Sequence, residues 1–346
     1  MLVLAVLAIS VAVMTSASGQ STARISGHLI NIGLALAVMV VMANVPPHLL
    51  SKAGPPLYAV GVILLIGVAL FGEIRNGSRR WLDFGVIAFQ PSELLKLALP
   101  LMLAWYFQRN EAVLGSRHFA IGGILLLLPF LLILRQPDLG TALMIGASGF
   151  YLLFFAGLPW KVILAGGVLG GASLPLAWRF MHDYQQQRVL TLLDPSSDPL
   201  GAGYHIIQST IAIGSGGLFG KGWMEGTQNQ LDFIPERTTD FIFAVFGEEF
   251  GYVGAILLAA LYLAIVARGL TIAARAPTQF GRLMAATLSL NLFTYVFVNI
   301  GMVSGILPVV GVPLPLMSYG GTALVTLLLG TGILMSVATH WQLNKT

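Results

Sequence analysis

Ten apolar stretches, most of them long enough to cross a lipid bilayer as a helix, constrain what this chain can fold into. They cover residues 1–18, 28–44, 57–72, 91–107, 119–134, 140–157, 161–178, 240–267, 282–304 and 320–339. A spanning helix needs about 20 predominantly apolar residues. Only 9% of the 346 residues are charged, against about 25% in soluble domains. The sequence therefore predicts an all-α polytopic membrane protein with about ten transmembrane helices in one domain, 1–346.

The two ends of the chain are expected in the cytoplasm. The first stretch ends in small residues, as a signal peptide does, but no positively charged residue precedes it, so we expect a true span. Ten spans place both termini on one side. The segments on that side contain one acid, Glu111, and the cations Lys52, Arg109, Arg117, Lys161, Arg268, Arg275, Arg282 and Lys345. Short positive loops favour the cytoplasm, which predicts a multi-pass protein of the cytoplasmic membrane.

The largest segment outside the spans is 179–239, a predicted extracytoplasmic loop between helices seven and eight. An apolar run at 205–213 predicts a short helix in it. A glycine-rich turn at 214–222 contains Lys221. Such a turn can expose backbone N–H groups to phosphate oxygens, or it can be a plain re-entrant turn. It lacks the GKS/T ending of a nucleotide-binding loop, which excludes an ATPase of that type.

A polar segment, FIPERTTD, runs directly into the eighth span and carries Glu236, Arg237 and, at the joint, Asp240. Thr238 or Thr239 is expected to cap the helix, which places Asp240 in its first turn. The helix dipole and Arg237 would then favour the ionised carboxylate, a group suited to accept a proton. Glu248 and Glu249 lie about 12–14 Å deeper, where a structural role is at least as well supported as a catalytic one.

Charges recur at the outer ends of other spans. Glu93 and Lys96 are three residues apart on one helix face, and ionisable groups at this depth usually line a cavity. A structural ion pair is the alternative. Asp138 opens the sixth span, where an acid also suits the helix dipole. Arg79 and Arg80, beside Trp81, are candidates to bind a lipid phosphate or to anchor the chain at the interface.

The last outer segment, NIGMVSGILPVVGVPLPLMSYGG, contains three prolines, which exclude a regular helix across 307–315. Irregular backbone at membrane depth requires cover by protein or a watery cavity. This segment is therefore expected to pack over an outer cavity, with Ser318 at its mouth.

The sequence indicates neither a disulfide or metal site nor nucleic-acid binding. The chain has no cysteine, its six histidines show no ligand spacing, and no basic run suggests nucleic acid. A layer of polar groups at the outer leaflet, open to water and to lipid, favours a substrate with a polar head and a lipid tail.

Three long motifs resemble the SEDS family (shape, elongation, division and sporulation), closest to its rod-elongation members. They are PERTTDFIFAVFGEEFG, LLDPSSDPLGAGYHIIQSTIAIGSGGLFGKGW and the proline-rich segment above. The resemblance runs from about Ser16 to the last span. The family usually has a short cytoplasmic tail in front, which leads us to expect a different natural start.

The resemblance implies a peptidoglycan glycosyltransferase that polymerises lipid II at the outer membrane face. It also implies a class B penicillin-binding protein as partner. The family's essential Asp corresponds to Asp240, its QPSE-x-x-K pair to Glu93 and Lys96, and its QPDLG acid to Asp138. Lys96, Arg79, Arg80, Lys221 and Arg237 are then candidates to stabilise the departing undecaprenyl diphosphate. A divalent cation, Mg²⁺ or Mn²⁺, would suit the same task, but no motif indicates one.

Two alternatives predict different behaviour. A flippase for the lipid-linked precursor would need essential charges near the bilayer midplane, where only Glu248 and Glu249 are candidates. A non-catalytic scaffold would keep its function when Asp240 is replaced.

Overall fold

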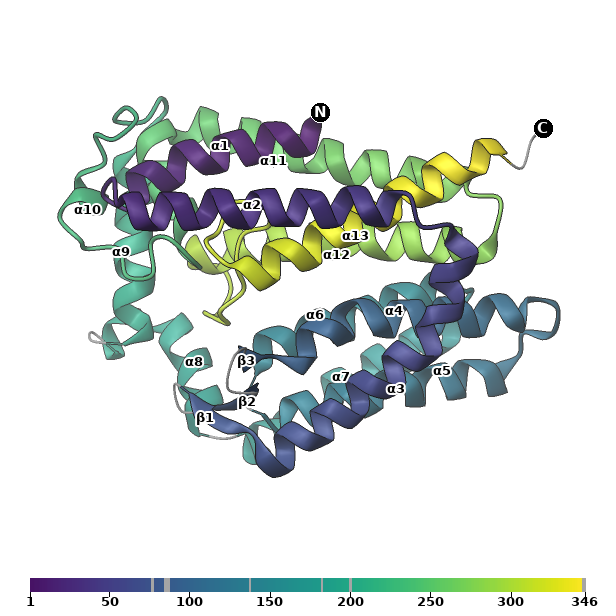
Figure 1. Ribbon diagram of the computed structural model, residues 1–346. Coiled ribbons are helices and arrows are strands. Elements are labelled where there is room, and N and C mark those ends of the chain that lie inside the picture. Colours follow the sequence, from purple (N-terminus) through teal and green to yellow (C-terminus); the bar gives the residue numbers. More distant parts are fainter. Residues whose placement is uncertain (76–77, 84–87, 137, 182, 199–200, 344–346) are drawn as a thin grey trace. The chain divides into compact units, whose positions relative to one another are not determined.

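The chain is described by a computed structural model that covers all residues except 76–77, 84–87, 137, 182, 199–200 and 344–346. The described ranges contain α1 (Leu2–Ala17), α2 (Thr22–Ala43), α3 (Pro47–Phe71), α4 (Pro91–Arg109), α5 (Ser116–Leu134), α6 (Leu139–Phe155), α7 (Trp160–Phe180), α8 (Asp183–Leu193), α9 (Ala202–Ser215), α10 (Thr227–Gln230), α11 (Ile242–Arg275), α12 (Gln279–Val303) and α13 (Gly321–Leu343) (Figure 1). They also contain the strands β1 (Glu73–Arg75), β2 (Ser78–Asp83) and β3 (Ala88–Phe89), and 3-10 turns at Glu111–Val113 and Pro195–Ser197.

Each of the ten predicted spans corresponds to a helix, α1–α7 and α11–α13. Among the described residues, α2, α3, α5, α11, α12 and most of α13 have the length and composition to cross a membrane, and α1, α6 and the first part of α7 are shorter apolar helices. The prediction of a polytopic all-α membrane protein is confirmed. The boundaries differ at α3, which begins at Pro47 instead of residue 57 and continues through Pro55 and Pro56. Proline suits the first helical position because its missing N–H would have no partner there.

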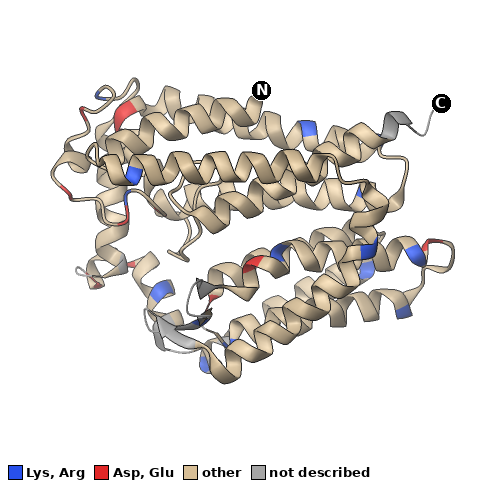
Figure 2. Cartoon of the chain, in the orientation of Figure 1, with Lys and Arg blue, Asp and Glu red and all other residues tan. Residues whose placement is uncertain are grey.

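The outer faces of these helices are apolar. Ile30 is 69% exposed, Val41 63% and Phe71 82%. Charged residues gather at helix ends and in the connecting segments, and long stretches of helix carry none (Figure 2). Continuous exposed apolar surface of this kind marks contact with lipid, since a soluble protein rarely exposes it.

The chain forms two compact units. Unit 1 contains Met1–Leu29, Leu158–Tyr262 and Tyr295–Gly320, and unit 2 contains Ile30–Gly157, Leu263–Thr294 and Gly321–Thr346. In unit 2, α4 packs against α3, α6 and α13, and α5 packs against α6. Between α3 and α4, the described residues form a small antiparallel sheet in the order β1-β2-β3, with Glu73 opposite Trp81, which was not predicted. The single domain stays a prediction.

In unit 1, the described residues between α7 and α11 form the helices α8, α9 and α10. The predicted short helix at 205–213 is confirmed as part of α9. It is not merely a surface helix, because Ser209 is fully buried and its hydroxyl donates to the carbonyl of Val303 over 2.8 Å. The proline-rich segment after α12 is irregular from Ser304 to Gly320, as predicted.

The eighth predicted span contains a break that the sequence reading missed. Gly251 in α11 has φ +66° and ψ −167°, so the helix is interrupted there. The glycine-rich turn at 214–222 pairs with the backbone of α11 at this interruption. Lys221 N donates to the Glu248 carbonyl over 3.0 Å, and Tyr252 N donates to the Gly217 carbonyl over 2.9 Å. A side chain at Gly251 would lie 2.2 Å from the backbone nitrogen of Gly220, so the close approach requires glycine.

We predict that Gly251→Ala lowers the free energy of unfolding of the protein in detergent. The positive φ alone costs an alanine about 1–2 kcal/mol, and the contact with Gly220 adds to this. Thermal unfolding followed by circular dichroism provides the measurement. Gly67→Ala in α3 is the control, because Gly67 has a helical backbone and no atom near its Cβ position. Equal unfolding midpoints for the two variants would contradict the role given to the break.

Candidate active site

Asp240 lies in the turn that precedes α11, not in its first helical turn as predicted. Its carbonyl oxygen accepts a hydrogen bond from Asn299 Nδ2 over 2.8 Å, and the same Nδ2 donates to the carbonyl of Val312 over 2.7 Å. The following residue, Phe241, is only 2% exposed. The backbone of Asp240 is therefore held from two sides, while its side chain stays partly exposed.

The two threonines do not cap the helix as expected. Thr239 Oγ1 donates instead to the carbonyl and the carboxylate of Glu236. The backbone oxygen of Thr238 accepts from Tyr319 N over 2.8 Å. Both residues thus shape the turn in front of α11, and the turn sets the direction of the Asp240 side chain.

The electrostatic setting of Asp240 also differs from the expectation. Burial, followed by the nearby carboxylate of Glu236, raises the pKa of Asp240 to about 6. The guanidinium of Arg237, which was expected to favour the ionised form, bonds to the Asp232 carboxylate and the Asn229 carbonyl. A base works best when its pKa is near the working pH, so the raised pKa suits proton abstraction better than an ordinary aspartate would.

The proline-rich segment packs against this turn. Ser318 Oγ donates to the carbonyl of Thr239 over 2.6 Å and accepts from Leu314 N over 2.8 Å. A Cβ atom at Gly311 would lie 3.5 Å from Asp240 Oδ2. Ser318 is only 6% exposed. These contacts favour a positioning role for Ser318, and its predicted contact with substrate stays a prediction.

A cavity of about 270 Å³ lies beside this turn, lined by Arg24, Asp232, Ile234, Glu236, Arg237 and Thr238. The predicted site residues Glu236 and Arg237, which are neighbours in the sequence, both line it. Arg24 and Asp232 were missed. Arg24 follows the first span as a single cation, and only the fold brings it next to a segment more than two hundred residues later.

Lys221 forms an ion pair with the buried acid Glu248. Its Nζ lies 2.8 Å from Glu248 Oε1 and donates to Thr227 Oγ1 over 2.7 Å. Glu248, which is fully buried, also accepts from Gln228 N over 2.9 Å and Asn229 N over 3.3 Å at the start of α10. The contacts favour a structural role for Lys221 over the predicted contact with the diphosphate.

The glycine turn is not an open phosphate cradle. The N–H groups of Gly220, Lys221 and Gly222 donate to the carbonyls of Gly216, Glu248 and Glu249. Of the two alternatives, the contacts therefore favour the re-entrant turn over the phosphate cradle, because Gly220 N–H bonds within the turn and those of Lys221 and Gly222 bond the α11 backbone. The second acid, Glu249, accepts a hydrogen bond from Ser16 of α1, which gives it a contact within unit 1 that ties α1 to α11.

Unit 2 holds the second group of predicted residues. Lys96 Nζ lies 2.6 Å from Glu93 Oε1, with side-chain exposures of 13% and 14%. Thr326 Oγ1 of α13 lies 3.4 Å from Glu93 Oε2. The intrahelical pair is thus present, and it faces α13 within the bundle, not lipid.

Asp138 caps α6 instead of sitting inside its first turn. Its Oδ1 accepts from Thr141 N over 3.0 Å. Its Oδ2 accepts from Gln90 Nε2 over 3.3 Å and lies 3.5 Å from Arg80 Nη1. Asp138 and Arg80 are therefore partners, and both lie beside the start of α4, as their expected common level requires. The side chain of Arg79 and residue 137 lie outside the described part of the structure.

The predicted site residues thus form two groups, each within its own unit. Asp240, Glu236, Arg237, Ser318 and Lys221 belong to unit 1, and Glu93, Lys96, Asp138 and Arg80 to unit 2. That the two groups form one polar layer stays a prediction. Within the described ranges, no three His, Asp or Glu side chains are arranged to hold a metal ion.

The fold and these charge groups define a polytopic helical membrane protein with a carboxylate at the head of a spanning helix. A family model for the FtsW, RodA and SpoVE cell cycle proteins matches residues 1–343. The chain belongs to this family.

Among its relatives, the peptidoglycan glycosyltransferase MrdB of Escherichia coli is 55% identical over 98% of this chain and 92% of that protein. The peptidoglycan glycosyltransferase RodA of Treponema pallidum is 35% identical over 81% of this chain and 82% of its own.

Two solved structures of related chains have the same fold. A chain from a peptidoglycan synthase complex that coordinates polymerization and crosslinking has a TM-score of 0.85 and 35% identity, covering 98% of this chain and 96% of that one. The rod shape determining protein RodA of Thermus thermophilus has a TM-score of 0.73 and 30% identity, covering 97% and 94%.

We predict that Lys221→Met destabilises the protein by about 3–5 kcal/mol, because it leaves the buried Glu248 carboxylate without its cation. The double variant Lys221→Met/Glu248→Gln is expected to recover part of the loss. Thermal unfolding of the purified variants measures this. If Lys221 instead bound the diphosphate, Lys221→Met would raise KM for the lipid substrate and leave the unfolding midpoint unchanged.

Proposed function

We propose that this protein polymerises lipid II into glycan strands at the outer face of the cytoplasmic membrane, with Asp240 as the general base. The enzyme class follows from its relatives: the chain is a peptidoglycan glycosyltransferase. The single observation that carries the proposal for Asp240 is its position, a partly exposed residue on a held backbone that directly follows a turn lining a polar cavity.

The chemistry needs one base and several cations. The GlcNAc 4-hydroxyl of one lipid-linked disaccharide attacks the anomeric carbon of the chain-end MurNAc. Its proton passes to Asp240, undecaprenyl diphosphate leaves, and the anomeric centre inverts. Of the predicted cations, Arg237 lies with Arg24 at the cavity near Asp240, while Lys96 and Arg80 belong to the other group. We propose that these arginines and Lys96 stabilise the diphosphate charge.

We also propose a protein partner and an orientation of the chain in the membrane. A related chain occurs in a peptidoglycan synthase complex, which supports a class B penicillin-binding protein as the partner that crosslinks new strands. The bias of positive charge in the short loops supports cytoplasmic termini and an outer location for the segment between α7 and α11. The flippase alternative is not favoured, because its midplane candidates Glu248 and Glu249 bind Lys221, the α10 backbone and Ser16.

We predict that Asp240→Asn lowers glycan polymerisation by about 100-fold or more, the usual range for loss of a general base. Purified protein with its transpeptidase partner would receive lipid II in detergent, and polymer would be resolved on gels. Asp194→Asn is the matched control, since Asp194 is exposed and caps a 3-10 turn that asparagine caps equally well. Polymer at the wild-type level from Asp240→Asn would refute the base and favour a scaffold role.

The rate should also depend on pH through Asp240. Because the ionised form accepts the proton, kcat/KM is expected to fall about tenfold for each pH unit below a pKa of about 6. Glu236→Gln removes the nearby negative charge that contributes to the raised pKa. The acid limb of the pH profile should therefore move to lower pH in this variant. A limb that stays in place or moves upward would contradict this electrostatic account.

A further inference from the structure

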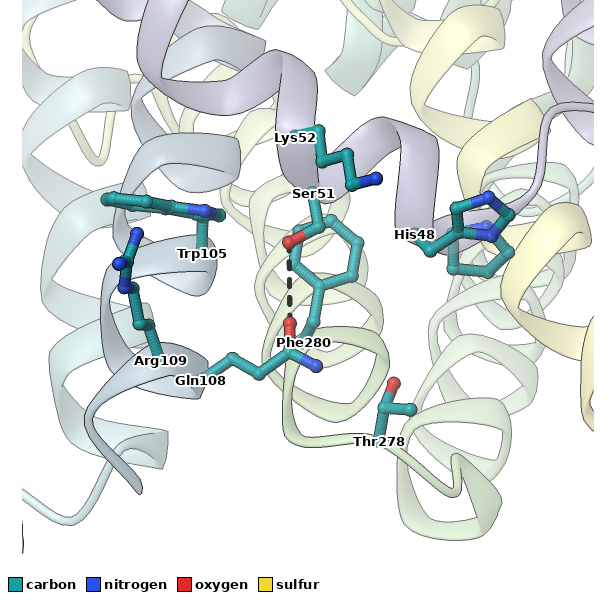
Figure 3. A pocket seen from close by; sticks show the side chains of 9 residues that line it. His48, Ser51, Lys52, Trp105, Gln108, Arg109, Thr278 and Phe280 are labelled. Carbon is teal, nitrogen blue, oxygen red and sulfur yellow. Dashed lines mark hydrogen bonds between the residues drawn. The ribbon is translucent and has the colours of Figure 1, made fainter. Parts of the chain in front are cut away.

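A second pocket, of about 430 Å³, opens in unit 2 (Figure 3). Glu93 lies in the first turn of α4 and Arg109 in its last, so the two ends are separated by about 24 Å along the helix. This pocket is thus at the opposite membrane face from Glu93. In the proposed orientation that face is cytoplasmic.

The pocket is positively charged. Lys52 and His48 from the start of α3 and Arg109 from the end of α4 line it, and no acidic residue does. Among the described residues, neither Lys52 nor Arg109 belongs to an ion pair. Two cations that form no ion pair among the described residues favour an external anion as their partner.

Backbone dipoles add to this charge. The pocket includes Pro47, the first residue of α3, and Thr278, whose hydroxyl accepts from Gly281 N over 3.1 Å and so caps α12. The N-termini of α3 and α12, each the positive end of a helix dipole, therefore line the same pocket as the cationic side chains. Ser51 and Gln108 are hydrogen-bonded to each other over 3.3 Å and form a polar wall between α3 and α4.

The remaining walls are apolar and suit a lipid better than a small soluble anion. Phe280 is 1% exposed and forms the floor, and the Arg109 guanidinium lies 5.5 Å from the ring centre of Trp105. Tryptophan in this position is typical of the headgroup level of a membrane. Leu49, beside His48 on α3, is 48% exposed and provides apolar surface for an acyl chain.

We propose that this pocket binds the phosphodiester headgroup of an anionic membrane phospholipid. Lys52 and Arg109 hold the phosphate, and Trp105 and Phe280 contact the glycerol and the upper acyl chain. Basic pockets between transmembrane helices at the cytoplasmic side recognise anionic headgroups in this way. The site is separate from the polymerisation chemistry, so the proposal does not depend on the role of Asp240.

The test is lipid retention by the full-length protein in detergent, measured by native mass spectrometry with dioleoyl phosphatidylglycerol and, separately, dioleoyl phosphatidylcholine. We expect the wild type to retain phosphatidylglycerol in preference to phosphatidylcholine. Lys52→Gln/Arg109→Gln should weaken phosphatidylglycerol binding by about thirtyfold, with phosphatidylcholine binding unchanged. The charge-preserving Lys52→Arg/Arg109→Lys should keep the binding, which separates loss of charge from loss of fold.

Arg117→Gln/Lys161→Gln is the matched control. It removes the same charge from exposed positions of the same predicted face that do not line the pocket. An equal loss of lipid in this control would overturn the proposal in favour of general surface attraction. Unchanged retention by Lys52→Gln/Arg109→Gln would overturn it as well. Displacement of the lipid by millimolar inorganic phosphate would show that the site takes a soluble anion instead.

Discussion

The interruption of α11 at Gly251 is the constraint on which the arrangement of unit 1 depends. A broken helix leaves backbone donors and acceptors without partners, and buried polar groups of this kind must be satisfied. Here the glycine-rich turn supplies both donors and acceptors. The ion pair of Lys221 with Glu248 fixes the same turn from the side chains. One local break therefore fastens the segment between α7 and α11 onto the helix whose start carries Asp240.

At the head of that helix, the backbone is held and the carboxylate is left available. Main-chain oxygens of Thr238, Thr239 and Asp240 each accept a hydrogen bond from the segment 299–319. No hydrogen-bond donor among the described residues contacts the Asp240 side chain in return. Rigid support around a reactive group that keeps its own bonding capacity free is the arrangement that pre-organised catalysis needs.

The helices that lipid requires could be predicted from the sequence, whereas features that depend on close contacts between distant segments could not. Apolar length located all ten spans, and proline content located the irregular segment after α12. The strands at 73–90 were missed, although the dipeptide Asn76–Gly77 is a known hairpin signal. The glycine turn was misread because its partners in the α11 backbone, Glu248 to Val253, are distant in the sequence. The direction of the Asp240 pKa shift was predicted wrongly, because desolvation depends on the three-dimensional surroundings and Arg237 bonds other groups.

The side-chain amide of Asn299 has a mechanical consequence. Its one nitrogen bonds the carbonyl of Asp240 and the carbonyl of Val312 at once. The proline-rich segment and the backbone of Asp240, the proposed base, are thereby joined through a single group. A displacement of the proline-rich segment would therefore also move the backbone that carries Asp240, so that in the proposed reaction product movement and the position of the base would be coupled.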